Sequence, residues 1–472
     1  MKKFLAMMLA VLMLLSMATV AMADGTNNID HGTWNKTDIA NGGTFNLVKV
    51  YTNGQFAPDE TFDFTFDADD KNPADVGVPT ITAKPSNKDG NLSSTITVKL
   101  PEYSKVGTYK YTMTEKSDTQ TKGVVYDTDP RTLMVYVENA TISKEDGTTT
   151  PGFKCQVALY KGEKKDDRFT NVYNQGTAKI TKEVDSYLGA DKDQSYTFNI
   201  KLSDVNDVNY TGVVVDANGE PVADVANVTI HGTSETTFTL KDGQSLKIEH
   251  LPNGASYTVT ETKPSVDASH NGTVTVKYDN VEAVYNENGV STNAASGEIK
   301  TNETTTSTIA NNFAYKGDLI VKKVVTGNLG DEGKWFSFTV KGLPQNFELG
   351  NMDKVRNQGL VEGGDYVFEM QHDGYITFKD IPYGTSYTVT EKADGYNSSK
   401  TVEQYFVGDA KDSSATDDEK MDHVKEVVTF TNDNQQNIAT GVSLDTLPYV
   451  LVLALAGAGL VLMIARKRRV QD

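Results

Sequence analysis

Apolar and polar residues alternate along most of this chain, and the alternation predicts β-strands rather than helices. The alternating stretches are rich in Val, Ile, Thr, Tyr and Phe, and clusters of Gly, Asn and Asp separate them. No long amphipathic helical pattern occurs within residues 24–435. The pattern therefore predicts an all-β fold of sandwiches. In the first part of the chain it places strands at residues 44–51, 61–66, 95–100, 109–115, 133–138 and 153–160.

One strand pattern occurs three times. It reads Tyr257-Thr258-Val259-Thr260-Glu261, Tyr387-Thr388-Val389-Thr390-Glu391 and Tyr111-Thr112-Met113-Thr114-Glu115. Because successive strand residues point to opposite faces, the Tyr, the central Val or Met and the Glu share one face. A Glu that is carried into a core is costly unless it is protonated or paired. Three copies, about one domain length apart, need a common explanation.

Other features recur at matching distances from this pattern. Each repeat opens on a Gly-x-apolar-x-apolar-x-Lys run, continues with an aromatic strand, and closes on apolar-x-Asn. The opening runs lie at 43–49, 176–182 and 317–323, the aromatic strands at 62–64, 196–198 and 336–338, and the closing segments at 169–171, 309–311 and 430–432. Each repeat thus carries an inward Lys, an inward Glu and an inward Asn, in that order.

The repeats divide the chain into domains, and the two ends have a different composition. Three β-sandwich domains are predicted, at residues 41–175, 176–316 and 317–435, which suits a chain of 472 residues. The ends comprise a signal peptide at 1–23 with cleavage between Ala23 and Asp24, a leader at 24–40, a linker at 436–446, an uncharged apolar transmembrane helix at 447–465, and a basic cytoplasmic tail at 466–472. This layout predicts an exported protein.

Composition excludes several classes of function. The net charge of −19 argues against nucleic-acid binding. The six His residues lack metal or triad spacing, and there is no phosphate loop, so neither a metal nor a cofactor is expected. Cys155 is the single cysteine, which rules out an intramolecular disulfide, and its alternation with Phe153 and Val157 predicts a packed core thiol. An exported β protein without disulfides makes another covalent cross-link worth considering.

The recurring Lys, Glu and Asn can supply such a cross-link if the Lys strand and the Asn strand are neighbours. Burial lowers the pKa of an amine and raises that of a carboxyl, so a neutral nucleophile and a neutral acid can coexist. The acid would hydrogen-bond the Asn carbonyl, and the amine would attack it and release ammonia. Taken alone, each residue has an ordinary explanation on a solvated face or in a turn. In the second repeat Asn311 is preferred to the adjacent Asn312 because Ile309-x-Asn311 matches the other repeats.

These residues resemble a known family. The Tyr-Thr-Val-Thr-Glu strand at 257–261 with its preceding Leu251-Pro252-Asn253-Gly254 resembles the E-box of Cna protein B-type domains. The segments 123–127 and 169–173 are similar to the isopeptide domain of streptococcal major pilins. The resemblance implies immunoglobulin-like sandwiches in a sortase-assembled pilin of Gram-positive bacteria. It also implies three intramolecular isopeptide bonds: Lys49–Asn171 with Glu115 as the acid, Lys182–Asn311 with Glu261, and Lys323–Asn432 with Glu391.

The C-terminal region resembles a cell-wall sorting signal, with a motif, an apolar span and a basic tail. The motif is Asn437-Ile438-Ala439-Thr440-Gly441, which keeps the Thr-Gly of the usual motif and has Ala in place of its Pro. The resemblance implies cleavage after Thr440 by a pilus-specific sortase and transfer to an amine of the next subunit. By position in the similar pilins, Lys164 is the preferred acceptor, with Lys161 and Lys165 as alternatives in the same basic cluster.

The sequence therefore predicts a structural subunit of a covalently polymerised cell-surface pilus, anchored in the membrane as a precursor and not an enzyme acting on an external substrate. The implied partners are identical subunits, the sortase and peptidoglycan, with the membrane during assembly and minor pilins or host ligands as further candidates. The alternative is a wall-anchored adhesin or a minor tip or basal pilin. The state of the protein in cell-wall extracts separates the two hypotheses, because only a backbone subunit gives a ladder of covalent polymers.

Overall fold

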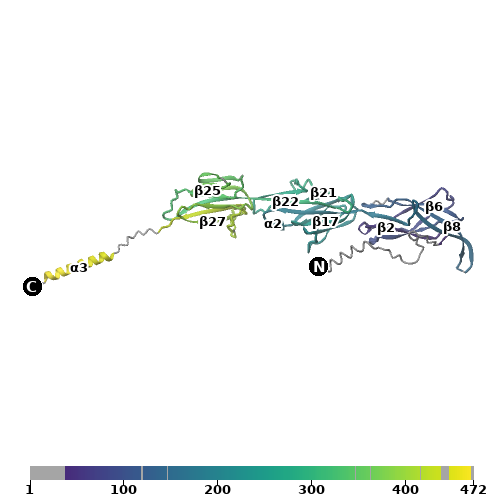
Figure 1. The fold of residues 1–472 in the computed structure, drawn as a ribbon, viewed down its shortest axis with the longest axis horizontal. Coiled ribbons are helices and arrows are strands. Elements are labelled where there is room, and N and C mark those ends of the chain that lie inside the picture. The colour runs from purple at the N-terminus through teal and green to yellow at the C-terminus, as the bar shows by residue number, and fades with distance from the viewer. Residues whose placement is uncertain are drawn as a thin grey trace. The chain divides into compact units, whose positions relative to one another are not determined.

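The structure is a computed structural model that describes residues 38–117, 121–145, 147–345, 347–361, 363–414, 416–436 and 446–468. Strands dominate the described residues, so the predicted all-β fold is confirmed (Figure 1). The chain divides into two compact units, which we describe separately. The first comprises the residues up to Pro264 together with Thr275–Asn312, and the second comprises Ser265–Val274 and the residues from Phe313 onwards.

The N-terminal part of the first unit contains two sheets, ordered β1-β9-β8-β6-β3, with β10 on β9, and β4-β5-β2-β11-β7. Side chains from both sheets form one core, including Leu47, Tyr111 and Phe169. The elements are β1 (Ile39–Ala40), β2 (Thr44–Thr52), η1 (Gly54–Phe56), β3 (Phe64–Ala68), β4 (Thr80–Ala83), η2 (Lys88–Gly90), β5 (Ser93–Lys99), β6 (Gly107–Glu115), β7 (Val124–Val125), β8 (Arg131–Ser143), β9 (Thr149–Lys161), β10 (Lys164–Lys165) and β11 (Arg168–Tyr173).

Further along the first unit, two more sheets have the orders β15-β14-β17-β12-β22 and β16-β13-β18-β21. Their inward residues are fully buried, for example Ile180 on β12 and Phe198 on β13. The elements are β12 (Gln175–Asp185), α2 (Gly189–Asp193), β13 (Tyr196–Ser203), β14 (Asn209–Val215), β15 (Val228–His231), β16 (Thr236–Leu240), β17 (Ser245–Pro252), β18 (Ser256–Glu261), β19 (Gly272–Tyr278), β20 (Val281–Glu282), β21 (Ala295–Glu298) and the start of β22 (Thr304–Thr326).

The second unit is built on the remainder of β22, which pairs with both β25 and β28. Next to β25 lie β23 and β24, β26 follows β23, and β27 pairs with β28. Phe338, Phe368 and Phe378 are central to its core. The elements are β23 (Phe336–Lys341), β24 (Glu348–Leu360), β25 (Tyr366–Pro382), β26 (Thr388–Glu391), β27 (Asn397–Tyr405), η3 (Val407–Asp409) and β28 (Lys425–Asp433).

The same parallel strand pair occurs three times. β2 runs parallel to β11, β12 to β22, and β22 to β28. The register is also the same: Lys49 lies opposite Phe169, Lys182 opposite Ile309, and Lys323 opposite Phe430. In each pair the partner of the Lys is the apolar residue two positions before the closing Asn. Since side chains alternate, the Asn points to the same face as that apolar residue.

The glycine that opens each repeat has a steric reason. A Cβ atom built on Gly43, Gly176 or Gly317 would lie 2.7, 2.3 or 2.0 Å from a backbone carbonyl oxygen. These distances are shorter than any van der Waals contact, so a side chain would force the backbone apart. The glycine lets the first strand of each repeat begin against the neighbouring backbone, six residues before the Lys.

The C-terminal helix α3 (Thr446–Arg468) covers the predicted apolar segment 447–465 (Figure 1). Among the described residues, however, no helix is both long enough and apolar enough to cross a membrane. The predicted transmembrane helix is therefore not confirmed. The predictions for the signal peptide, for the cleavage between Ala23 and Asp24, and for the motif at 437–441 lie outside the described residues.

Candidate functional site

The first Lys–Glu–Asn group lies inside the core between β2, β6 and β11. The pattern of β2 alternates between buried and less buried positions, and Lys49 occupies a buried one. Its Nζ donates a hydrogen bond of 2.8 Å to Glu115 Oε2, and Asn171 Nδ2 donates one of 2.7 Å to Glu115 Oε1. All three side chains are at most 2% exposed. The carboxyl group therefore bridges the amine and the carboxamide.

The second group repeats this arrangement on β12, β18 and β22. Lys182 Nζ donates to Glu261 Oε2 over 3.1 Å, and Asn311 Nδ2 donates to Glu261 Oε1 over 2.7 Å. The adjacent Asn312 is exposed, because alternation along β22 turns it to the other face. Of the two asparagines that the sequence offered, the structure brings Asn311 to the Lys and the Glu.

The third group lies on β22, β26 and β28. Lys323 Nζ is 2.9 Å from Glu391 Oε1, and Asn432 Nδ2 donates to the same oxygen over 3.0 Å. The Lys323 amine also donates to the backbone carbonyls of Val324 and Phe430, at 3.1 and 3.3 Å. In this group one carboxylate oxygen serves both partners, whereas each of the other groups uses two oxygens.

Each buried amine also lies over an aromatic ring. The distances from Nζ to the ring centroid are 4.8 Å for Lys49 and Phe62, 4.5 Å for Lys182 and Tyr196, and 4.5 Å for Lys323 and Phe336. These rings open the aromatic segments that recur in the sequence at 62–64, 196–198 and 336–338. They replace water around the amine with an apolar surface that still attracts a cation.

Burial controls the ionisation of the first two groups. Loss of hydration lowers the pKa of Lys49 and of Lys182 to about 8, although Glu115 and Glu261 oppose the shift. Burial likewise raises the pKa of Glu115 and of Glu261. It also lowers the pKa of Lys323. Both shifts favour the neutral amine and the neutral acid, which are the forms that acyl transfer between the side chains requires.

The orientation of the carboxamide differs from the sequence-based expectation. We expected the Glu to hydrogen-bond the Asn carbonyl, but in all three groups it accepts a hydrogen bond from the amide nitrogen. The carbonyl oxygen of Asn171 instead accepts a hydrogen bond of 2.8 Å from the backbone N–H of Asp127. A backbone N–H can only donate, which fixes the oxygen on that side. The Glu is thus placed next to the leaving nitrogen.

The three candidate acceptor lysines have different surroundings. Lys161 pairs with Asp129 at 2.7 Å and with Asp127 at 3.6 Å, and the bond to Asp129 raises its pKa. Lys165 is half-buried, whereas Lys164 is exposed on β10 and forms no ion pair with any described residue. Of the three, Lys164 alone is both exposed and without an ion pair among the described residues.

Cys155 lies on β9 with its side chain fully buried in the first core, as the alternation predicted. Burial raises the pKa of its thiol to about 11. A thiol that is buried and protonated at neutral pH is a poor nucleophile.

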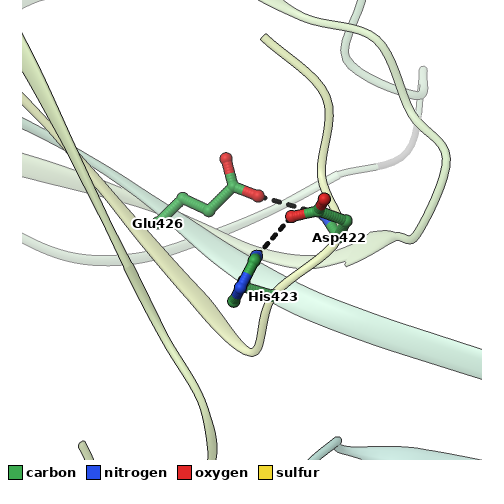
Figure 2. Close-up of side chains that lie close together, drawn as sticks. All are labelled: Asp422, His423 and Glu426. Carbon is green, nitrogen blue, oxygen red and sulfur yellow. Dashed lines mark hydrogen bonds and ion pairs between the residues drawn. The ribbon is translucent and has the colours of Figure 1, made fainter. Parts of the chain in front are cut away.

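A second polar cluster lies in the second unit and was not singled out from the sequence. Figure 2 shows Asp422 joined by hydrogen bonds to both His423 and Glu426. Ligand atoms of these three residues lie within 4.8 Å of one another, a spacing that a metal ion could bridge. Each of these three side chains already forms hydrogen bonds within the protein, since His423 also contacts Asp412 at 3.1 Å and Glu426 accepts from Tyr387 over 2.6 Å. We interpret the cluster as a network that fastens the segment before β28.

Comparison with known proteins places the chain in a family. Residues 176–313 and 317–434 each match a domain of unknown function (DUF7601), and residues 45–174 match a Spy0128-like isopeptide containing domain. A pilin of Streptococcus pyogenes serotype M1 is 30% identical over 186 residues, which cover 38% of this chain and 52% of that protein. The chain thus spans about half the length of this curated relative.

Solved structures of pilins are also similar to the chain. The major pilin from Streptococcus pyogenes is 23% identical and matches with a TM-score of 0.38, covering 58% of this chain and 99% of that one. A second major pilin (T3.2) from the same species is 20% identical with a TM-score of 0.36, over 58% and 99% of the two chains.

The two DUF7601 matches cover more than half of the chain, so the chain belongs to the DUF7601 family. The Spy0128-like isopeptide containing domain precedes these two matches in the sequence. The predicted resemblance to Gram-positive pilins is confirmed.

Proposed function

We propose that this protein is a structural subunit of a Gram-positive cell-surface pilus and that it forms three intramolecular Lys–Asn isopeptide bonds without an enzyme. The observation that carries the proposal is the threefold recurrence of a buried Lys, Glu and Asn on strands in one register. The match of residues 45–174 to an isopeptide containing domain supports it independently. We further propose that each group lies in its own β-sandwich, three in all.

The chemistry follows from the contacts in each group. The neutral Lys amine attacks the Asn Cγ and forms a C–N bond, and the electron pair of the carbonyl moves to Oδ1. The electron pair on Oδ1 then re-forms the carbonyl bond, and the bond from Cγ to Nδ2 breaks. As it breaks, the Glu delivers a proton to the departing nitrogen. The Glu recovers a proton from the former amine, so the net products are one amide and one ammonia. Folding supplies the proximity that an enzyme would otherwise provide.

The ends of the chain support joining of subunits and anchoring. We propose that a sortase cleaves after Thr440 and transfers the new carboxyl end to the Nζ of Lys164 on the next subunit. Exposure of Lys164, together with the ion pair and raised pKa of Lys161, favours Lys164 as acceptor. The apolar segment 447–465 and its basic tail would hold the precursor at the membrane before cleavage, and the finished fibre would be attached to peptidoglycan.

The intact mass of the purified chain tests the isopeptide proposal. The folded protein should be lighter than its sequence by three molecules of ammonia, and peptide mapping should find the three linked pairs. The full sequence mass in a folded protein would refute the proposal. Cell-wall extracts test the assembly step: a backbone subunit gives a ladder of polymers that survives boiling in detergent, whereas a wall-anchored adhesin gives one band.

A further inference from the structure

The three groups differ at the oxygen of the asparagine carboxamide. In the first group Asn171 Oδ1 accepts the backbone N–H of Asp127 at 2.8 Å. In the other two, Asn311 Oδ1 and Asn432 Oδ1 are buried and have no hydrogen-bond partner among the described residues. This oxygen is where negative charge develops when the amine attacks. Each group thus has a buried amine and an acid, but among the described residues only the first has a hydrogen-bond donor at the oxygen where the charge develops.

The Asp127 N–H is held in place by a buried arginine. Arg131 is 1% exposed, and its guanidinium donates to Asp127 Oδ2 at 2.6 Å, to the Asp129 carbonyl at 2.7 Å and to the Arg168 carbonyl at 2.9 Å. It also packs over the Phe169 ring, 4.6 Å from its centroid. Arg168 and Phe169 belong to β11, the strand that carries Asn171. The arginine therefore ties the loop that donates the N–H to the strand that presents the amide.

Asp127 is fastened to β11 a second time. Its Oδ2 accepts the backbone N–H of Thr170 at 3.1 Å, and Lys161 lies 3.6 Å from its Oδ1. The side chain of Asp127 thus anchors the loop while its main chain contacts the Asn171 oxygen. Such an N–H is already oriented before the reaction begins, so no reorganisation is needed as charge develops.

We propose that the backbone N–H of Asp127 is the oxyanion donor for formation of the Lys49–Asn171 bond, that Arg131 is its positioning residue, and that this bond consequently forms before the other two. The inference rests on the proposed isopeptide chemistry and adds a donor specific to the first group. When the Lys49 amine bonds to Cγ of Asn171, the electron pair moves onto an oxygen that already has a hydrogen bond. In the other groups the same charge develops on an oxygen without one.

The order of bond formation tests the proposal in the unmodified full chain. The chain is recovered in the unfolded, unlinked form and refolded by dilution. Samples are quenched at intervals in acid denaturant, and the three linked peptides in each sample are quantified by mass spectrometry. Removing one oxyanion donor costs enzymes a factor of about 100 to 1,000 in rate. We therefore expect the Lys49–Asn171 peptide to appear about a hundredfold sooner than the others. Equal rates at the three sites would overturn the inference.

Two variants test the role of the loop. Asp127→Ala keeps the N–H but removes both anchors, and Arg131→Met removes the guanidinium at similar length. Each variant should slow formation of the Lys49–Asn171 link about tenfold or more. The rates of the other two links should not change, so those links serve as internal controls. Asp127→Asn retains an acceptor for Thr170 and should restore most of the rate.

A further measurement separates positioning from folding. Hydrogen exchange at β2 and β11 should show the two strands paired in the Arg131→Met chain while the link is still absent. The proposed donor would be refuted if, in Arg131→Met, linking were slow only in molecules whose strands are unpaired. It would also be refuted if the Lys49–Asn171 bond formed at an unchanged rate in Asp127→Ala. If no linked peptide forms at any site, the isopeptide proposal itself fails and this inference falls with it.

Discussion

At the scale of single residues, the sites place a cation and an acid where neither would normally be stable. Removing an ion from water costs several kcal/mol even after the protein relaxes. Each Lys–Glu contact reduces this cost because the pair can hold one proton in two ways, either as an ion pair or as two neutral groups. The neutral arrangement is the one that the proposed reaction requires, and the apolar surroundings favour it. The burial that costs free energy is thus what would make the amine nucleophilic in the proposed reaction.

This shared proton predicts a bell-shaped pH dependence for formation of the Lys49–Asn171 bond. Above about pH 8, the lowered pKa of Lys49, the pair loses its last proton, so no acid remains to protonate the departing amide nitrogen. In acid the pair gains a second proton, so the amine is charged and cannot attack. The rate begins to fall at a pH above the usual pKa of glutamate, because burial raises the pKa of Glu115. The rate should fall about tenfold per pH unit on either side. Refolding followed by mass spectrometry measures it, and a rate that still rises well above pH 8 would contradict it.

Two neighbouring asparagines allow a matched test of the second site. Asn311→Ala should lie only two ammonia molecules below its own sequence mass, because the carboxamide that bonds Glu261 and would form the second link is gone. Asn312→Ala changes an exposed side chain and should leave all three losses intact. Intact mass and peptide mapping give the result. Loss of the link in Asn312→Ala alone would show that the wrong asparagine has been assigned.

At the scale of elements, repetition in the sequence predicted more than any single stretch did. The alternation around Lys182, Glu261 and Asn311 placed all three on inward faces, and three copies indicated that the strands meet. Asp127 lies in the segment 123–127, whose sequence resembles that of pilins, but its proposed role depends on a backbone N–H that no side-chain pattern reveals. The cluster around His423 was also missed, since it joins residues whose spacing follows no known motif.

The opening glycine of each repeat leads to a prediction about stability. In Gly317→Ala the new methyl group would lie 2.0 Å from the His423 carbonyl oxygen, so the strand must move. We expect the second unit to lose about 1–3 kcal/mol, as for other overpacked sites. Gly359→Ala in the same unit is the control, because a Cβ there meets nothing within 4 Å. Denaturant unfolding in a Glu391→Gln background, which prevents the third link, measures both. Equal effects would refute the steric explanation.

At the scale of the whole molecule, the proposed joining of subunits would depend on the exposed amine of Lys164. Lys164→Ala should abolish the ladder of polymers in cell-wall extracts. The monomer should still show the loss of three ammonia molecules that its internal links cause. Lys161→Ala and Lys165→Ala are the matched controls, and both should retain the ladder. Immunoblots of boiled extracts show the outcome. A ladder that persists in Lys164→Ala but disappears in either control would reassign the acceptor.

The shared strand β22 carries Asn311 towards its start and Lys323 near its end, and this placement determines where the chain can be cut. Once the links have formed, a protease that nicks any loop between Lys182 and Asn311 leaves both fragments joined by the side-chain amide. Only cuts outside the three closed rings, such as those within 172–181 or 312–322, would release a piece, and these short stretches lie almost entirely in strands. A subunit nicked once within a ring would stay in one piece and gain only the mass of one water, and a fibre of such subunits would remain unbroken because the side-chain amides still join its parts.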